Sequence, residues 1–489
     1  MNKILFSHSY FLRFDPKQWA TGQPYPPLGT LYAAACIREA GNEVSLFDTM
    51  FCHKPEEIIS VLDEIKPDFF VVCDDGFNYL TKMCLTNMRE AAFRMIRQAK
   101  GRDCKVIVSS SDATDRYRQY LDKGADFVIL GEAEETLREL ITWIQNGKSG
   151  FSGINGIAFR DRQDYVKTAP RTVIRDLDLL PMPAWDLIDL NPYRSAWINH
   201  AGYFSLNMAT TRGCPFKCNW CAKPIYGNRY HARSPEHVVK ELKWLKERYA
   251  FDHIWFCDDI FGLKPGWVNA FASLIETENL HFKFKIQARA DLLLKEDNVR
   301  ALARAGCDNI WMGAESGSQK ILDAMDKGIT VQQIEEATRL IRKLGMKPSF
   351  FIQFGYLGET KEDIDMTIRM INHLLPYEIG ISVSYPLPGT IFYEKVKGNI
   401  RQKTNWTDSD EMALMFQNTY SPAFYKQLHR FVHKSYRKHI AFDNLQWLLK
   451  HPANGRFTHL KKALSGLYYI PATFFEKRKL RQLEKTVPL

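Results

Sequence analysis

The chain has 489 residues, of which 45% are hydrophobic and 25% charged, and its formal net charge is +10. This length allows two or three domains with a core each, and the composition is that of a globular protein and not of a disordered or fibrous one. No apolar run approaches the roughly 18 residues that a membrane-spanning helix needs, and the first residues lead into a strand and not into a signal peptide.

The ten cysteines divide into a cluster and a scattered set. Cys36, Cys73, Cys104 and Cys257 stand singly in apolar segments. This usage is typical of a reducing compartment and not of a disulfide framework, so we expect a cytoplasmic protein.

Residues 1–147 alternate strands with helices. The strands that we expect are residues 3–7, 43–47, 68–73, 104–108 and 126–130, with helices such as 28–40, 55–65, 82–100 and 115–123 between them and another from residue 134. This order predicts a doubly wound parallel sheet, on which ligands bind beyond the carboxyl ends of the strands.

Residues 148–200 are expected to connect two domains. The segment 150–160 suggests a small hairpin, and the segment 175–186 is a linker with Pro181 and Pro183. Such a linker would let the first domain sit over the mouth of the second.

A second α/β run fills residues 201–395. We expect strands at 206–210, 253–257, 282–288, 309–314, 349–354 and 380–385, and a helix at 234–249 with Ser234 as its N-cap. Six strands that alternate with helices predict a partial (β/α)6 barrel. The chemistry of such barrels lies at the carboxyl ends of their strands.

Three cysteines follow the first barrel strand at the spacing C-x3-C-x2-C: Cys214, Cys218 and Cys221. Thiolates at this spacing can hold three corners of one iron–sulfur cluster and leave one iron open. Two alternatives are a structural zinc site with His231 as the fourth ligand and a chance group of buried thiols. Zinc sites favour paired C-x2-C units, and no second pair follows downstream.

The stretch Cys214-Pro-Phe-Lys-Cys218-Asn-Trp-Cys221 resembles the radical S-adenosylmethionine (SAM) superfamily, with Trp220 at the aromatic position before the third cysteine. The resemblance implies a [4Fe-4S] cluster whose open iron binds SAM and cleaves it to methionine and a 5′-deoxyadenosyl radical.

Polar residues after four later strands extend this resemblance. It implies that Asp258 or Asp259 contacts the SAM amino group, that Arg289 pairs with the SAM carboxylate, and that Glu315 and Ser316 make polar contacts to SAM. The turn Gly355-Tyr-Leu-Gly-Glu-Thr360 resembles a family turn that frames the adenine and ribose of SAM. The alternative is that Glu359 and Thr360 simply cap the next helix. Each of these motifs is weak alone, but together they occur in order behind the cysteines.

The first domain resembles the cobalamin-binding domain of one branch of this superfamily, through Pro26-Pro-Leu-Gly29, Ala40-Gly-Asn-Glu-Val44 and Gly124-Ala-Asp-Phe-Val-Ile-Leu-Gly-Glu-Ala-Glu134. It departs from that domain at Ser109-Ser-Ser-Asp112, where the family has a Gly-Gly-Pro-His type of turn, and at Asp74-Asp-Gly76. The resemblance implies cobalamin near Ser109, Ser110 and Gly131, with no histidine offered as a lower cobalt ligand. A vestigial domain used for packing is the alternative.

The C-terminal region, residues 396–489, mixes aromatic residues with Lys, Arg and His. Tyr425, Leu428, Phe431, Val432, Tyr436 and Ile440 recur near helical spacing, with basic residues between them. The pattern fits either a basic amphipathic surface that meets an anionic membrane or a lipid-like substrate, or a helical cap packed on the barrel. The sequence favours the cap.

The predicted function is therefore a cobalamin-dependent radical SAM enzyme, most simply a C-methyltransferase that uses methylcobalamin at an unactivated carbon. The alternatives are an oxidative cyclase or rearrangement enzyme that transfers no methyl group, and a zinc-stabilised binding protein without catalysis. The expected partners are a small-molecule or lipid-like substrate and an external one-electron reductant of the flavodoxin or ferredoxin type. No nucleic-acid partner is expected, because no recognised RNA-binding module is present.

Overall fold

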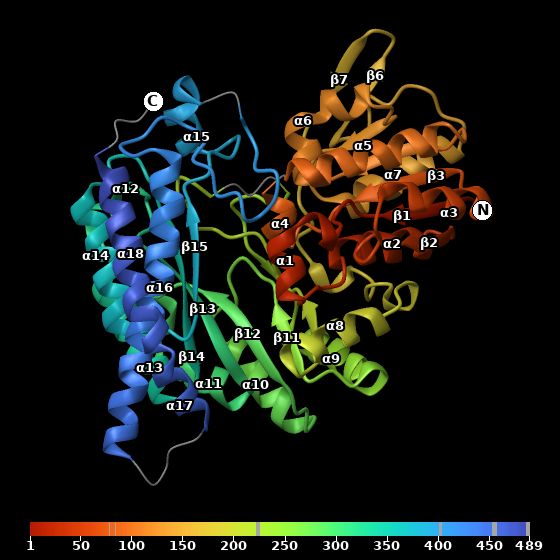
Figure 1. Cartoon of the computed structure of the whole chain (residues 1–489). Coiled ribbons are helices and arrows are strands. Elements are labelled where there is room, and N and C mark those ends of the chain that lie inside the picture. The colour runs from red at the N-terminus through yellow and green to blue at the C-terminus, as the bar shows by residue number, and fades with distance from the viewer. Residues whose placement is uncertain (78, 84, 222–224, 401–402, 452–456, 486–489) are drawn as a thin grey trace.

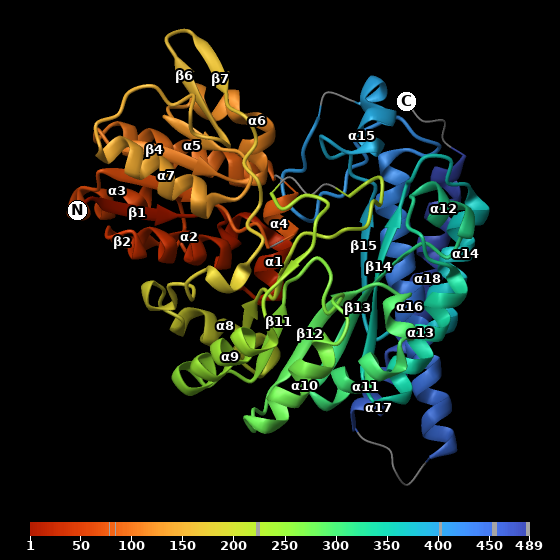
Figure 2. The ribbon, with the colours of Figure 1, turned by 180° about the vertical axis from the view of Figure 1, so that it is seen from behind.

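A computed structural model describes residues 1–77, 79–83, 85–221, 225–400, 403–451 and 457–485. Two large sheets lie side by side, one mixed and one parallel, and a layer of C-terminal helices covers the outer flank of the second (Figure 1). The same three parts are seen from behind in Figure 2. The predicted fold class is confirmed.

The N-terminal sheet has the strand order β2-β1-β3-β4-β5-β6-β7. The first five strands are parallel and the last two antiparallel: β1 (Lys3–Ser7), β2 (Glu43–Phe47), β3 (Phe69–Cys73), β4 (Lys105–Ser109), β5 (Phe127–Ile129), β6 (Ile157–Asp161) and β7 (Asp164–Lys167). The expected hairpin at 150–160 is wrong in position, because the turn falls at 162–163 and β6 pairs with β5 to extend this sheet.

Helices cover both faces of this sheet: α2 (Leu28–Glu39), α3 (Ile58–Ile65), α5 (Thr86–Lys100), α6 (Ser111–Asp122) and α7 (Ala133–Gln145). The short helices α1 (Pro16–Thr21) and α4 (Tyr79–Lys82) lie at the side of the sheet that faces the half-barrel (Figure 1). Alternate strand residues point to opposite faces. Leu5, Phe70 and Val106 therefore pack with α3 and α5, whereas Ile4, Val71 and Ile107 pack with α2 and α7.

The expected helix at 115–123 begins earlier, at Ser111. The hydroxyl of Ser110 accepts a hydrogen bond from the Ala113 amide at 2.9 Å, and this N-cap fixes the start of α6 directly after β4.

The second sheet is wholly parallel and open, in the order β15-β14-β13-β12-β11-β8, so it forms half a barrel. Its strands are β8 (Ser205–Met208), β11 (His253–Phe256), β12 (Lys283–Ala288), β13 (Cys307–Glu315), β14 (Lys347–Phe354) and β15 (Ile379–Val383). Around it lie α8 (Asn191–Ala201), α9 (Pro235–Tyr249), α10 (Trp267–Thr277), α11 (Glu296–Arg304), α12 (Gln319–Ala324), α13 (Val331–Lys343) and α14 (Lys361–Leu374). A two-stranded ladder, β9 (Thr211–Arg212) with β10 (His231–Ala232), follows β8.

The C-terminal helices are α15 (Ile391–Val396), α16 (Pro422–Lys450), α17 (Phe457–Leu464) and α18 (Gly466–Glu484). The first half of α16 is a cap, because Tyr425, Leu428, Phe431, Val432 and Tyr436 are buried. The Tyr436 hydroxyl donates to the carbonyl of Pro376 at 2.5 Å and so ties α16 to the segment before β15. The domain boundaries at 147, 200 and 395 stay predictions.

Candidate active site

The cysteine loop, which we define as residues 213–221, leaves the half-barrel at the end of β9. Gly213 has φ +77°, and a side chain there would place its Cβ 2.3 Å from the Arg229 carbonyl oxygen. Only glycine allows this turn. Cys214, Cys218 and Cys221 are all half-exposed on the loop, at the carboxyl side of the barrel, where sequence analysis expects the chemistry.

Asn219 anchors the cysteine loop to the rest of the barrel. Its buried side chain donates to the Ala324 carbonyl and to Asp326, each at 2.8 Å, and accepts from the Tyr356 hydroxyl at 2.7 Å. Its backbone amide donates to Met325 at 3.1 Å. A residue between two cysteines is therefore fixed from three directions.

We expect Asn219→Ala to lower the free energy of unfolding by about 1–3 kcal/mol, because its buried partners lose their hydrogen bonds. Since the loop loses its anchor, cluster affinity should fall about 10–100-fold. Iron retention during gel filtration would measure this. Asn269→Ala, at a half-buried helical site with one 3.4 Å contact, is the control and should retain iron. Equal iron loss in both variants would contradict the anchoring role.

The donor chemistry of the loop fits an iron–sulfur cluster, since three thiols lie within eight residues. Within the residues that the structure describes, no three Cys, His, Asp or Glu side chains converge as a metal site. The thiols must therefore turn toward a common point on loading, and half-exposed side chains on an irregular loop can do so at low cost.

Charged residues gather beside the cysteine loop at the ends of β12 and β13. The guanidinium of Arg289 lies 3.7 Å from the ring centre of Phe216, and its Nε donates to Asp291 at 3.0 Å. Glu315 is buried with φ +58° and pairs with Lys327 at 2.7 Å. Lys327 in turn lies 5.9 Å from the ring of Trp220. The structure thus brings Trp220, Arg289 and Glu315 together around the loop.

The other three predicted SAM contacts are placed differently. Asp258 is fully buried and accepts from the Thr210 amide, the Thr211 amide and the Thr210 hydroxyl, each at 2.7 Å. Asp259 is exposed and pairs with Lys82 of α4 at 2.7 Å. The Ser316 hydroxyl lies 3.0 Å from that of Thr367 and accepts from the Ser318 amide. Asp258 and Ser316 therefore hold turns of the barrel.

The turn after β14 contains a buried carboxyl group, that of Glu359. Its Oε2 accepts from the Gly355 amide at 2.6 Å. Its Oε1 has no hydrogen-bond partner in the described part of the chain. Burial raises the pKa of Glu359 to about 8, so the carboxyl is protonated in the folded protein at neutral pH.

Between the ordinary glutamate pKa and about 8, only the folded state keeps this proton, so its contribution to stability falls as pH rises. Glutamine mimics the protonated acid. We expect Glu359→Gln to raise the free energy of unfolding by about 1–3 kcal/mol at pH 8 and to change it little at pH 5. Urea unfolding at both pH values would measure this. A gain of equal size at both would contradict the assignment.

The carboxyl ends of the N-terminal strands face the cysteine loop. Ser109, at the end of β4, pairs in register with Ile129, so Ser109, Ser110 and Gly131 lie at the ends of two neighbouring strands. Both serines are buried, and the Ser110 hydroxyl is used as the N-cap of α6. Gly131 has φ +103°, and a Cβ there would lie 3.8 Å from the Ile225 carbonyl. These small residues suit a cobalamin site because of their size, and less because they offer free hydrogen-bonding groups.

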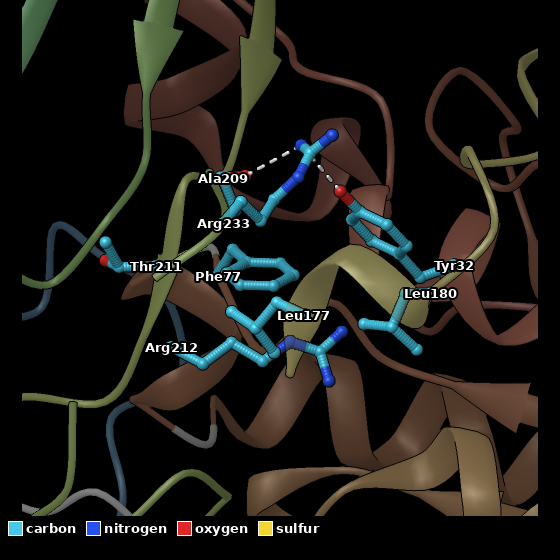
Figure 3. A pocket seen from close by; sticks show the side chains of 8 residues that line it. All are labelled: Tyr32, Phe77, Leu177, Leu180, Ala209, Thr211, Arg212 and Arg233. Carbon is cyan, nitrogen blue, oxygen red and sulfur yellow. Dashed lines mark hydrogen bonds between the residues drawn. The ribbon is translucent and has the colours of Figure 1, made fainter. Parts of the chain in front are cut away.

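Arg212, next to the cysteine loop, joins the two sheets. Its buried guanidinium pairs with Glu132 at 3.1 Å and with Glu134 at 2.5 Å, both at the start of α7. Tyr226 and Phe77 flank it at 5.2 and 5.7 Å. The cavity beside Arg212 has a volume of only about 10 Å³, and Arg233 closes it by donating to Tyr32 and to the Ala209 carbonyl (Figure 3). The contact between the sheets is therefore tightly packed around Arg212.

Sequence reasoning missed Arg212, Lys327 and Asn219. Glu132 and Glu134 lie inside the motif at residues 124–134, but nothing in the sequence pairs them with an arginine some 80 positions later. Lys327 lies on a loop twelve positions after Glu315, and no periodic pattern links the two residues. Asn219 lies inside the cysteine motif and could have been singled out there.

Comparison with known proteins agrees with this geometry. The radical SAM superfamily model matches residues 208–371, and a B12-binding domain model matches residues 20–141. Together the two models match more than half of the chain. The protein belongs to the radical SAM superfamily, in the branch with an N-terminal B12-binding domain. The cofactors of these two domains are a [4Fe-4S] cluster with SAM, and cobalamin.

Individual relatives are distant. An uncharacterised methyltransferase of Pyrococcus horikoshii is 27% identical over 392 residues, which cover 79% of this chain and 82% of the relative. An anaerobic magnesium-protoporphyrin IX monomethyl ester cyclase of Synechocystis is 26% identical over 65% of this chain and 62% of its own length. The structure of the cobalamin-dependent radical SAM enzyme OxsB with aqua-cobalamin bound superposes with a TM-score of 0.72 at 17% identity, covering 98% of this chain and 72% of that one. This last similarity shows the fold.

Proposed function

We propose that this radical SAM enzyme is a cobalamin-dependent C-methyltransferase that acts on an unactivated carbon. The observation that carries the proposal is the placement of the three-cysteine loop. It lies at the carboxyl side of the half-barrel, against the carboxyl edge of the B12-binding sheet, with Arg212 joining the two. A methyl donor on one side and a hydrogen-abstracting group on the other would then reach one substrate.

When bound, the [4Fe-4S] cluster with SAM would supply the hydrogen-abstracting radical chemistry, and cobalamin would supply the methyl group. The chain supplies ligands, charge and exclusion of water. We assign Cys214, Cys218 and Cys221 to the cluster and Trp220, Arg289 and Glu315 to SAM.

The remaining assignments follow from the hydrogen bonds. Asp259 is the carboxylate that we assign to the SAM amino group, since both oxygens of Asp258 are engaged by the turn after β8. We assign Ser109, Ser110 and Gly131 to a cobalamin site, because their side chains are small. An external flavodoxin- or ferredoxin-type reductant in the cytoplasm would supply the electron.

Anaerobic reconstitution followed by product mass analysis tests the proposal. We expect a brown protein with iron and sulfide in equal amounts, retained cobalamin, and a product that gains one methyl group per turnover. Stoichiometric zinc without iron would end the proposal, and so would a fully active enzyme that lacks cobalamin.

A second candidate is an oxidative cyclase or rearrangement enzyme with the same cofactors. The similarity to the cyclase of Synechocystis favours it. A product that loses hydrogens and gains no methyl group would select this candidate over methyl transfer.

A further inference from the structure

The C-terminal helices expose an unusual share of the protein's large apolar side chains. Of eighteen such exposed side chains in the described ranges, eleven lie between residues 442 and 475. We define them as the apolar C-terminal face: Phe442, Leu445, Leu449, Phe457, Leu460, Leu464, Leu467, Tyr468, Ile470, Phe474 and Phe475. They recur at i, i+3 and i+7 on α16 and again on α17, so each helix turns an apolar stripe to solvent.

This face is held in place by specific contacts and is not a loose tail. The Trp447 and His459 rings lie 4.2 Å apart and join α16 to α17. Lys434 pairs with Glu476 at 2.5 Å and joins α16 to α18. In Figure 1, α17 and the second half of α16 lie at the lower end of the molecule, away from the N-terminal sheet. The three helices therefore present one fixed surface.

The same segment carries the positive charge of the whole chain. Residues 422–485 contain fourteen Lys or Arg and three Asp or Glu, whereas the rest of the sequence contains 52 and 53. Lys450, Lys461, Lys462, Lys477, Arg478 and Lys479 lie among the exposed apolar residues. Aromatic and leucine side chains mixed with lysines are typical of surfaces that lie in the headgroup region of an anionic bilayer.

A large cavity between the half-barrel, N-terminal residues such as Tyr10 and Tyr25, and α16 borders this surface. Its lining runs from the starts of the barrel strands up to Gln287, two positions before Arg289. The volume of the cavity is about 1370 Å³, larger than the roughly 300–1,000 Å³ of a drug-sized site. Trp255, Trp311 and Phe351 of the barrel strands line it, and Tyr468 belongs both to this lining and to the apolar C-terminal face. The cavity and the exposed face therefore share one border.

The cavity favours an anionic occupant. Seven Lys or Arg side chains and three carboxylate side chains line it. Lys285 has no hydrogen bond and no ion pair within 4.0 Å among the described residues, and burial lowers its pKa to about 8. The ammonium is still mostly charged at neutral pH and faces the rings of Tyr25 and Trp255, each 5.3 Å away. An anion next to Lys285 would stabilise this buried charge, whereas the aromatic walls suit an apolar chain.

We propose that the apolar C-terminal face docks on an anionic lipid bilayer and that the barrel cavity takes an anionic lipid from it as the substrate. This substrate class rests on the proposed function. A second copy of the chain fits the face poorly, because a two-fold interface would oppose two surfaces of the same positive sign. No described helix is long and apolar enough to cross a membrane, so the docking is peripheral.

Vesicle flotation of the reconstituted enzyme tests the docking. We expect binding to vesicles of phosphatidylcholine with phosphatidylglycerol and at least about tenfold weaker binding to phosphatidylcholine alone. The variant L467S/F474S/F475S should bind at least about tenfold more weakly, as should K477E/R478E/K479E. The matched control L179S/I391S removes apolar side chains that are exposed elsewhere, and it should bind like the wild type.

Release of 5′-deoxyadenosine, measured with and without vesicles, tests the substrate. We expect phosphatidylglycerol vesicles to stimulate release, soluble glycerol phosphate not to, and K285M to lose about tenfold of the stimulation. An enzyme that cleaves SAM but does not bind vesicles would overturn only this inference. A dimer that forms in the wild type and is lost in the apolar variants would overturn it as well. Vesicle binding without a cluster would overturn only the proposed function.

Discussion

Replacing Arg212 by methionine should destabilise the contact between the two sheets by about 3–5 kcal/mol at pH 8. Arg212 is the cation that faces Glu132 and Glu134, and all three side chains are less than a tenth exposed. Removing it leaves two buried carboxylates without their partner, and that loss costs far more than the ion pair itself contributes.

The pH dependence of this effect has a definite sign. Burial raises the pKa of Glu132 to about 7 even with Arg212 present, and loss of the cation would raise it further. The folded variant then holds protons that the unfolded chain has lost, so its stability falls as pH rises from about 4.5. We therefore expect a smaller penalty at pH 5 than at pH 8.

A matched triple variant separates charge from packing. E132Q/E134Q/R212M keeps similar volumes and carries no buried charge, so its stability should lie within about 1–2 kcal/mol of the wild type. Urea unfolding with one probe in each sheet would measure both variants. A triple variant as unstable as R212M would show that shape and not charge holds the interface.

The fold was largely readable from the sequence because its signals are local. Apolar runs place the strands within two residues of their observed ends, and Ser234 is the N-cap of α9 as predicted. The hairpin β6–β7 was misplaced because its register is fixed by pairing with β5, which is not a local signal.

The candidate site was only partly readable, for the same reason. The cysteine spacing is a local pattern, whereas the partners of Arg212, Glu315 and Asn219 come from loops that meet only in the folded chain. For the C-terminal region, the sequence allows both a cap and a membrane-facing surface and does not show which residues form each. Helical spacing is the same whether a stripe packs inward, as in the first half of α16, or faces solvent, as beyond Ala441.

Replacing Cys218 by alanine should abolish both iron binding and SAM cleavage while changing the free energy of unfolding by only about 0.5 kcal/mol. The side chain is half-exposed on a loop, so little packing is lost. The loop offers only two thiols once Cys218 is gone, which are too few to hold a cluster with one open iron.

The three cysteines should behave as one unit. Residues that act together lose function non-additively, so each single variant should cost about as much activity as C214A/C218A/C221A. Iron content and 5′-deoxyadenosine release would measure this. C104A, at a buried cysteine directly before β4, should lose stability and keep iron, which is the reverse pattern. A single variant that kept half of the activity would mean that its thiol is not a ligand, and the open-iron chemistry would lose its basis in this loop.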